Sequence, residues 1–287
     1  MNLTKLAIGS AQFGLNYGIS NKKGIVQQEE IVSILKVCKE TGINSIDTAK
    51  GYGHSEEALG MAIQSLKYSQ WNIITKIHRF DSNISNQIKK SASRLTIPIN
   101  TVLAHSFELF MDKSFQNQLN KNKLNGQIQK FGVSLYTKKE ILSVLESKIL
   151  PDIIQLPLNI LDSKLYKDGI IRKIYNKKIE IHVRSVFLQG LFYLSAKDIK
   201  NRFPDAYSTI YRLKKIASKA KVSIAELSLL WVLSLDEIKK IIIGVENSDQ
   251  LKMHIESFKK SISQDLFKEA LRISYNNKYV LNPSLWK

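Results

Sequence analysis

Eight short apolar runs alternate with helical segments along this chain, and that alternation limits the fold more than any other feature. The runs are KLAIG (5–9), INSID (43–47), NIITK (72–76), TVLAH (101–105), KFGVS (130–134), IIQLP (153–157), IEIHVRS (179–185) and KIIIG (240–244). Strands that alternate with helices pair in parallel, because each parallel connection needs a crossover. Eight such units without a linker predict one α/β domain over residues 1–287, a closed (β/α)8 TIM barrel.

The segments between the runs support this interpretation. EEIVSILKVCKETG has apolar residues at helical spacing and ends at Gly42, a residue that favours a helix C-cap. TKKE at 137–140 and SIAE at 223–226 predict capping boxes, and residues 203–234 predict two helices. An open doubly wound sheet is the alternative. The first run lacks a following Gly-x-Gly-x-x-Gly, which argues against the dinucleotide-binding form of that sheet.

Charge and composition narrow the possible partners. The net charge is +18, but the lysines are scattered and form no continuous basic block interleaved with aromatic residues. We therefore expect a solvated surface and no nucleic-acid or membrane partner, with a basic nucleic-acid-binding protein as an open alternative. Cys38 is the single cysteine, which fits a reducing compartment. No signal peptide and no metal-ligand spacing are recognised, so the expectation is a cytoplasmic protein without metal.

Three of the runs end in residues that can carry chemistry. Asp47, Lys76 and His105 each close a run, and consecutive members are 29 residues apart. The carboxyl ends of barrel strands meet at one mouth, so an acid, an amine and an imidazole are predicted to converge there. Tyr52, in the loop after Asp47, would lie over the same mouth.

These four side chains suit the donation of a proton to an oxygen that becomes negative. A tyrosine has an ordinary pKa of about 10, and an adjacent ammonium eases its proton donation. Lys76 would keep its charge in an apolar mouth if Asp47 paired with it. His105 could donate a hydrogen bond to a carbonyl oxygen. None of the four can supply hydride, so a reductase of this design needs a nicotinamide cofactor.

The chain resembles the aldo-keto reductases along nearly its whole length. DTAKGYGHSEEALG is similar to the family's segment around the acid and the tyrosine, and IITK and LAHSFE to its lysine and histidine segments. KFGVSLY, IIQLPLNIL and IIIGVENSDQL are similar to its later strands. The resemblance implies an NAD(P)H-dependent carbonyl reductase of aldehydes or ketones. In it Tyr52 is the proton donor, Lys76 lowers its pKa, Asp47 balances the charge and His105 orients the carbonyl.

The resemblance also implies a set of cofactor contacts. They are Asp47, Ser134, Gln155, Ser185, Leu188, Gly244, Val245, Asn247, Ser248, Gln250 and Leu251. Ser134 and Gln155 would hold the carboxamide, and the residues after the seventh and eighth strands would hold the phosphates. Two positions depart from the family pattern, because Leu135 replaces a frequent asparagine and Arg184 replaces the tyrosine of a tyrosine-serine pair.

The 2′-phosphate of NADP(H) is a further point of departure. Many members bind this phosphate with a lysine and an arginine, at positions that are Gly244 and Gln250 here. Glu246 would repel a phosphate, whereas Lys252 could compensate. The resemblance as a whole still favours NADP(H) over NAD(H).

The substrate is a small carbonyl compound whose identity the sequence leaves open. Phe13 and Tyr17 follow the first strand and are expected to rim its pocket, and Trp286 in the tail either lines the pocket or is free. The positive field would suit an anionic substrate. A monomer is consistent with similar proteins. The alternative function is a catalytically slow nicotinamide-nucleotide-binding regulator, as in the β subunits of potassium channels.

Overall fold

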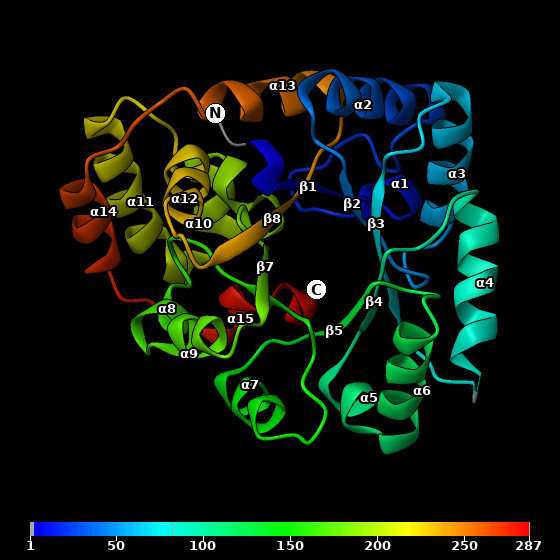
Figure 1. The fold of residues 1–287 in the computed structure, drawn as a ribbon. Coiled ribbons are helices and arrows are strands. Elements are labelled where there is room, and N and C mark those ends of the chain that lie inside the picture. Colours follow the sequence, from blue (N-terminus) through cyan, green and yellow to red (C-terminus); the bar gives the residue numbers. More distant parts are fainter. Residues whose placement is uncertain (1–2, 82, 287) are drawn as a thin grey trace.

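A computed structural model describes residues 3–81 and 83–286, and within them eight parallel strands close into a barrel (Figure 1). The strands pair in chain order, and the last one pairs with the first. They are β1 (Leu6–Gly9), β2 (Ser45–Asp47), β3 (Asn72–Ile77), β4 (Thr101–Ala104), β5 (Lys130–Ser134), β6 (Ile153–Pro157), β7 (Glu180–Arg184) and β8 (Ile238–Gly244). The predicted (β/α)8 barrel is confirmed, with every run forming a strand to within two residues.

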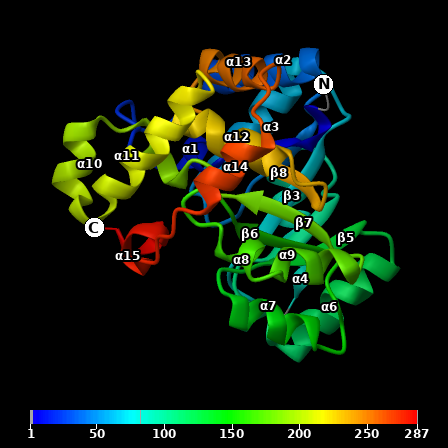
Figure 2. The same ribbon diagram turned by 90° about the vertical axis from the view of Figure 1, so that its left-hand side faces the viewer.

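Helices pack around the outside of the strands. They are α1 (Ala11–Gly14), α2 (Gln28–Thr41), α3 (Ser55–Leu66), α4 (Ile84–Leu95), α5 (Phe107–Met111), α6 (Lys113–Leu124), α7 (Lys138–Leu145), α8 (Lys164–Lys167), α9 (Ile170–Asn176), α10 (Ala196–Arg202), α11 (Pro204–Lys219), α12 (Ile224–Leu233), α13 (Ser248–Ser257), α14 (Gln264–Leu271) and α15 (Lys278–Leu281). Three short 3-10 segments are η1 (Leu3–Lys5), η2 (Leu188–Tyr193) and η3 (Pro283–Leu285). Figure 2 shows α10, α11 and α15 grouped on one side of the barrel.

The predicted capping residues determine where three of the helices begin or end. In the first predicted capping box, Thr137 Oγ1 accepts from the Glu140 backbone N at 3.2 Å, and Glu140 Oε2 accepts from the Thr137 backbone N at 2.9 Å. Ser223 and Glu226 form the second box in the same way. Gly42 adopts a φ of 77° and ends α2. Both capping boxes and this C-cap are therefore confirmed.

The strand register explains why equal spacing brings side chains together. Asp47 pairs with Ile74 on β3, and Lys76 pairs with Leu103 on β4. Paired residues of parallel strands face the same side, so Asp47, Lys76 and His105 all point into the barrel. Lys76 lies two residues after Ile74, the partner of Asp47, and His105 lies two residues after Leu103, the partner of Lys76. This offset matches the stagger of tilted barrel strands. His105 lies one residue past β4, but its backbone N still donates to β3 at 2.9 Å.

A small apolar plug fills the barrel below these side chains. Ile74, Leu103 and Ile153 form a separate buried cluster inside the ring of strands. The larger core lies between the strands and the helices. These three apolar side chains exclude water from the barrel interior, so charged groups at the mouth are shielded from water on that side.

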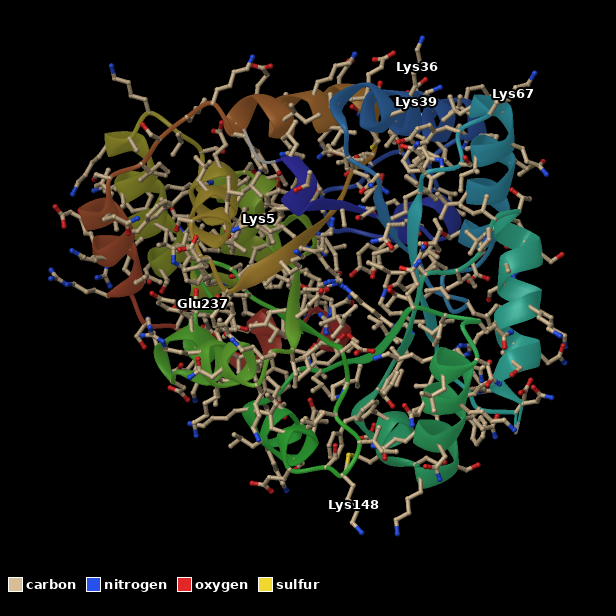
Figure 3. The ribbon with its side chains drawn as sticks, in the orientation of Figure 1. Lys5, Lys36, Lys39, Lys67, Lys148 and Glu237 are labelled. Carbon is tan, nitrogen blue, oxygen red and sulfur yellow. The ribbon has the colours of Figure 1, made fainter. Side chains whose placement is uncertain are left out.

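The surface carries the excess positive charge. Lys36 and Lys67 point away from the body of the protein, as does Lys148 on the opposite edge (Figure 3). In the part of the chain that the structure describes, no helix is both long enough and apolar enough to cross a membrane.

A buried carboxylate fastens the helix that follows the Tyr52 loop. Glu56, in the first turn of α3, is 1% exposed. Its carboxylate accepts from Thr75 Oγ1 on β3 at 2.7 Å and from Arg94 Nε on α4 at 2.7 Å. Ser91 Oγ donates to it as well, at 3.2 Å. One side chain thus connects α3 to a barrel strand and to the next helix.

Replacing Glu56 by Ala should lower the free energy of unfolding by about 3–5 kcal/mol, because the Arg94 guanidinium would lose its buried partner. Glu57→Ala is the matched control. The Glu57 side chain is 39% exposed and 3.6 Å from Arg94, so its loss should cost about 1 kcal/mol or less. Urea unfolding followed by circular dichroism measures both values, and equal losses would contradict this account of α3.

Candidate active site

Lys76 is the centre of the site at the barrel mouth. Its side chain is 1% exposed, and its Nζ pairs with Asp47 Oδ1. The same nitrogen donates to the Thr48 backbone O at 3.0 Å and to Tyr52 Oη at 3.4 Å. The structure thus places the predicted amine in direct contact with both the acid and the phenol.

The charge state of Lys76 follows from these contacts. Burial by itself lowers the pKa of the ammonium, but the Asp47 carboxylate and the Tyr52 phenol outweigh burial and leave that pKa raised. Asp47 Oδ2 accepts a further hydrogen bond from Gln155 Nε2 at 2.8 Å. Lys76 therefore stays charged at neutral pH, and both oxygens of the Asp47 carboxylate accept hydrogen bonds.

His105 lies beside Tyr52. The two rings meet edge to face, with centroids 5.8 Å apart and an interplanar angle of 79°. Burial, together with the positive charges of Lys76 and Arg184, lowers the pKa of His105 to about 3. The imidazole is therefore neutral at physiological pH and offers one N–H. A phenolic O–H and an imidazole N–H are thus available at the same place.

Two glycines set the position of the tyrosine. A Cβ on Gly14 at the end of α1 would overlap the Tyr52 backbone O, and a Cβ on Gly53 would overlap the Gly14 backbone O. Gly53 also has a φ of 57°, in the left-handed region. Only glycine permits α1 to lie this close to the Tyr52 loop. The GYG segment at 51–53 is the sequence signal for this approach.

A cavity of about 120 Å³ opens beside Tyr52 and runs toward β8. Of the predicted site residues, its lining includes Asp47, Tyr52, Tyr17, Ser185, Gly244 and Gln250. Phe13 does not line it, because its ring turns into the core from α1 and is 2% exposed. Trp286 does not line it either, since its ring packs on Phe203 at 4.9 Å between centroids.

The loop after β7 forms one wall of the cavity in a strained conformation. Ser185, Leu188 and Gln189 have φ values of 59°, 48° and 50°, which cost energy for residues other than glycine. Gln189 connects this wall to the first loop, because its backbone O accepts from Ile19 N at 2.9 Å and its Nε2 donates to Tyr17 Oη at 2.8 Å. The two loops together roof the cavity.

The carboxamide end of a nicotinamide fits the donor and acceptor set in the barrel. Gln155 Oε1 is buried and has no hydrogen-bond partner among the described residues, so it can accept from an amide N–H. Ser134 Oγ lies on the adjacent strand, within 3.4 Å of Arg184 Nε. Leu188, Val245 and Leu251 are buried apolar side chains behind the cavity wall.

The N-terminus of α13 already holds carboxylate and amide oxygens of this chain. Asn247 Oδ1 accepts from the Gln250 backbone N at 2.8 Å, and Glu30 Oε1 accepts from the Ser248 backbone N at 2.6 Å. Lys252, which the sequence offered as compensation, pairs with Asp249 at 3.1 Å. Glu30 could not be assigned from the sequence, because it lies on α2, 218 residues from Ser248.

Arg184 and Tyr136 are the other side chains that sequence reasoning did not assign. The Arg184 guanidinium lies over the Tyr136 ring, 4.1 Å from its centroid, and Arg184 lines the cavity. The departure from a tyrosine-serine pair was the only signal for it. Within residues 3–81 and 83–286, no group of His, Cys, Asp and Glu side chains could hold a metal ion.

The lowered pKa of His105 gives a direct test of the site's electrostatics. Proton NMR of the imidazole, assigned with a His105→Asn variant, should show a neutral ring from pH 8 to pH 5. The ring should take up a proton only as the pH approaches about 3. The unfolded chain binds that proton first, near pH 6.5, so this group lowers stability as the pH falls. A midpoint near 6.5 in the folded protein would contradict the described environment.

Comparisons with known proteins concern the sequence and the fold. The sequence matches the model of the Aldo/keto reductase family over residues 5–274. A glycerol dehydrogenase from Gluconobacter oxydans is similar in structure, with 22% identity, a TM-score of 0.72, and 97% of this chain and 93% of that chain covered. A thermostable aldo-keto reductase in complex with the inhibitor epalrestat has 20% identity, a TM-score of 0.72, and 94% and 95% covered.

At these identities the structural likeness concerns the fold, and a search of curated proteins gave no match. The family match extends over residues 5–274, which is nearly the whole barrel. The chain therefore belongs to the aldo/keto reductase family.

Proposed function

We propose that this oxidoreductase reduces an aldehyde or a ketone to an alcohol with NAD(P)H, and that Tyr52 donates the proton. The observation that carries the proposal is the position of Lys76 Nζ, which contacts the Asp47 carboxylate and the Tyr52 phenol at once. An ammonium held in place by a carboxylate beside a phenol supports proton donation by that phenol.

The hydrogen bonds of Lys76 determine the direction of the proton. Its Nζ has three N–H groups and three acceptors: Asp47, the Thr48 backbone O and Tyr52. Because the phenol oxygen accepts from Lys76, its own hydrogen is directed elsewhere and is free to point into the mouth. After that proton leaves, the ammonium stabilises the negative phenol oxygen.

A carbonyl oxygen at the mouth would meet two donors. The Tyr52 O–H and the neutral His105 N–H would both face it, stabilising the charge that grows on the oxygen during reduction. His105 would orient the carbonyl without protonating it, since its pKa is far below neutral pH.

The hydride has to come from the cofactor, which supplies it when bound. Gln155 Oε1 and Ser134 Oγ would hold the nicotinamide carboxamide, and Asp47 would face the adjoining ribose. Ser185, Leu188 and the Gly244–Leu251 segment would hold the remainder. The Tyr17–Gln189 hydrogen bond would keep the roof closed and water out.

Tyr52→Phe should lower kcat by about 10²- to 10⁴-fold, because the proton donor is lost. Its Kd for NADPH or NADH, from a fluorescence titration, should change by about threefold or less, since the hydrogen bond of the Tyr52 phenol is to Lys76 and not to Ser134 or Gln155. Tyr211→Phe is the matched control, because Tyr211 is exposed on α11. Nicotinamide oxidation with a panel of carbonyls measures kcat. Tight cofactor binding with slow turnover that Tyr52→Phe leaves unchanged would instead support the regulatory alternative.

The cofactor preference is a second element of the proposal, and the contacts at α13 change the sequence expectation. NADP(H) was favoured, but Glu30 already accepts from the first N–H of α13, where a 2′-phosphate would bind. Glu246 is a second carboxylate at this end of the cavity. Two carboxylates beside a phosphate repel it, whereas they can accept a hydrogen bond from a ribose hydroxyl. We therefore propose that NADH binds at least as tightly as NADPH.

Glu30→Gln should improve NADPH binding relative to NADH by about three- to tenfold, since it removes one repulsive charge. Glu29→Gln is the control, because it removes the same charge from the exposed neighbouring residue. Parallel fluorescence titrations with the two cofactors give the ratio of their Kd values. If both variants shift that ratio equally, the effect is general surface charge and not a specific site.

A further inference from the structure

Arg184 is a cation at the mouth whose contacts are all uncharged. At the end of β7, it donates to Ser134 Oγ at 3.4 Å, to Ser185 Oγ at 3.3 Å and to the Leu135 backbone O at 3.4 Å. These distances are at the long end of the hydrogen-bond range. No Asp or Glu among the described residues forms an ion pair with it. Arg94, which also lies partly inside the protein, is by contrast paired with Glu56.

The acids nearby are already engaged or form no ion pair with Arg184. Asp47 is the acid at the reacting end, and both of its oxygens are occupied, by Lys76 and by Gln155. Glu246 lines the same cavity, but no ion pair joins it to Arg184, and its backbone N donates to Gln250 Oε1 at 2.7 Å. The Lys76–Asp47 pair carries no net charge, so Arg184 leaves the reacting end of the mouth positive. A partly buried guanidinium is expected to have an anionic partner.

The guanidinium is held in a fixed position that faces the reacting groups. One face stacks on the Tyr136 ring at 4.1 Å, which limits its rotation. Its charge adds to the burial that lowers the pKa of His105, and it opposes the burial that raises the pKa of Tyr17 to about 12, so it lies near both of these side chains. It also lines the same cavity as Tyr52. A guanidinium has five N–H donors, so its three weak contacts leave donors free.

We propose that Arg184 binds an oxyanion of the substrate, so that the natural substrate is a carbonyl compound that also carries a carboxylate or a phosphate. Its carbonyl would lie at Tyr52 and His105, and its anionic group at the guanidinium. The inference rests on the proposed carbonyl reduction and specifies the substrate class of that site. A planar fork of N–H donors is the geometry that binds carboxylate and phosphate oxygens in pairs.

Three probes of matched shape test this assignment. They are 4-formylbenzoate, its uncharged methyl ester and 4-formylphenyl phosphate, each reduced at saturating cofactor. The wild-type protein should prefer at least one charged probe over the ester by about tenfold or more in kcat/KM. Whichever charged probe is preferred distinguishes the carboxylate from the phosphate.

Substitutions of Arg184 test whether this residue causes the preference for a charged probe. Arg184→Gln should abolish it, and Arg184→Lys should retain part of it, because lysine keeps the charge and loses the fork. Arg172→Gln is the matched control, since Arg172 is exposed on α9 away from the mouth, and it should behave as wild type. The ester serves as the internal measure of folding and cofactor binding in every variant.

Several outcomes would overturn the proposal. One is a wild-type protein that reduces the ester as well as both charged probes, which leaves carbonyl reduction itself intact. Another is an Arg184→Gln variant that keeps the preference. A third is an Arg184→Gln variant whose Kd for NAD(P)H rises tenfold while the preference persists, which would assign Arg184 to the cofactor's pyrophosphate.

Failure of the proposed function is recognised separately, because then no probe is reduced. Calorimetric titration of the three probes into wild type and Arg184→Gln, with cofactor present, still decides the role of Arg184. Tighter binding of a charged probe than of the ester, lost in Arg184→Gln, supports it. Equal binding of all three probes by the wild type contradicts it.

Discussion

The buried ion pair between Lys76 and Asp47 is the interaction on which the site depends. An ammonium taken out of water is costly unless a partner and hydrogen bonds satisfy it. Here Asp47 provides the charge, and the Thr48 carbonyl and the Tyr52 phenol complete the set. One pair thus couples β2, β3 and the tyrosine loop, and through Gln155 it reaches β6. Loss of either member would leave an uncompensated charge above the apolar plug.

The charges at the mouth divide into two regions. Glu246 lines the cavity near α13, and Glu30 accepts from the first backbone N–H of that helix, whereas Arg184 lines the cavity with Tyr52. A dinucleotide bound along the cavity would place its adenosine ribose near the carboxylates. The substrate would then meet the arginine. The proposed cofactor preference and the proposed substrate class therefore rest on the same uneven distribution of charge.

Much of the fold could be predicted because strands and helix ends depend on residues that are close together in the sequence. Short apolar runs gave the strands, and Thr137 and Ser223 gave helix starts through hydrogen bonds within three residues. The equal spacing of Asp47, Lys76 and His105 was informative because successive strand-helix units of a barrel bring their strand ends to the same mouth. Glu30 could not be foreseen, since its contact depends on how α2 packs against α13. Phe13 was expected at the pocket wall but packs in the core, because the sequence does not say which way a side chain of α1 turns.

A double-mutant cycle on the ion pair tests the central claim most directly. The rate of NAD(P)H-dependent carbonyl reduction would be compared in wild type, Asp47→Asn, Lys76→Met and the double variant. Residues that act as one unit have non-additive effects, so each single change should cost most of the rate and the double variant should be no worse than the slower single one. If the two losses multiply, or if either single variant keeps the wild-type rate, the pair does not govern proton donation by Tyr52.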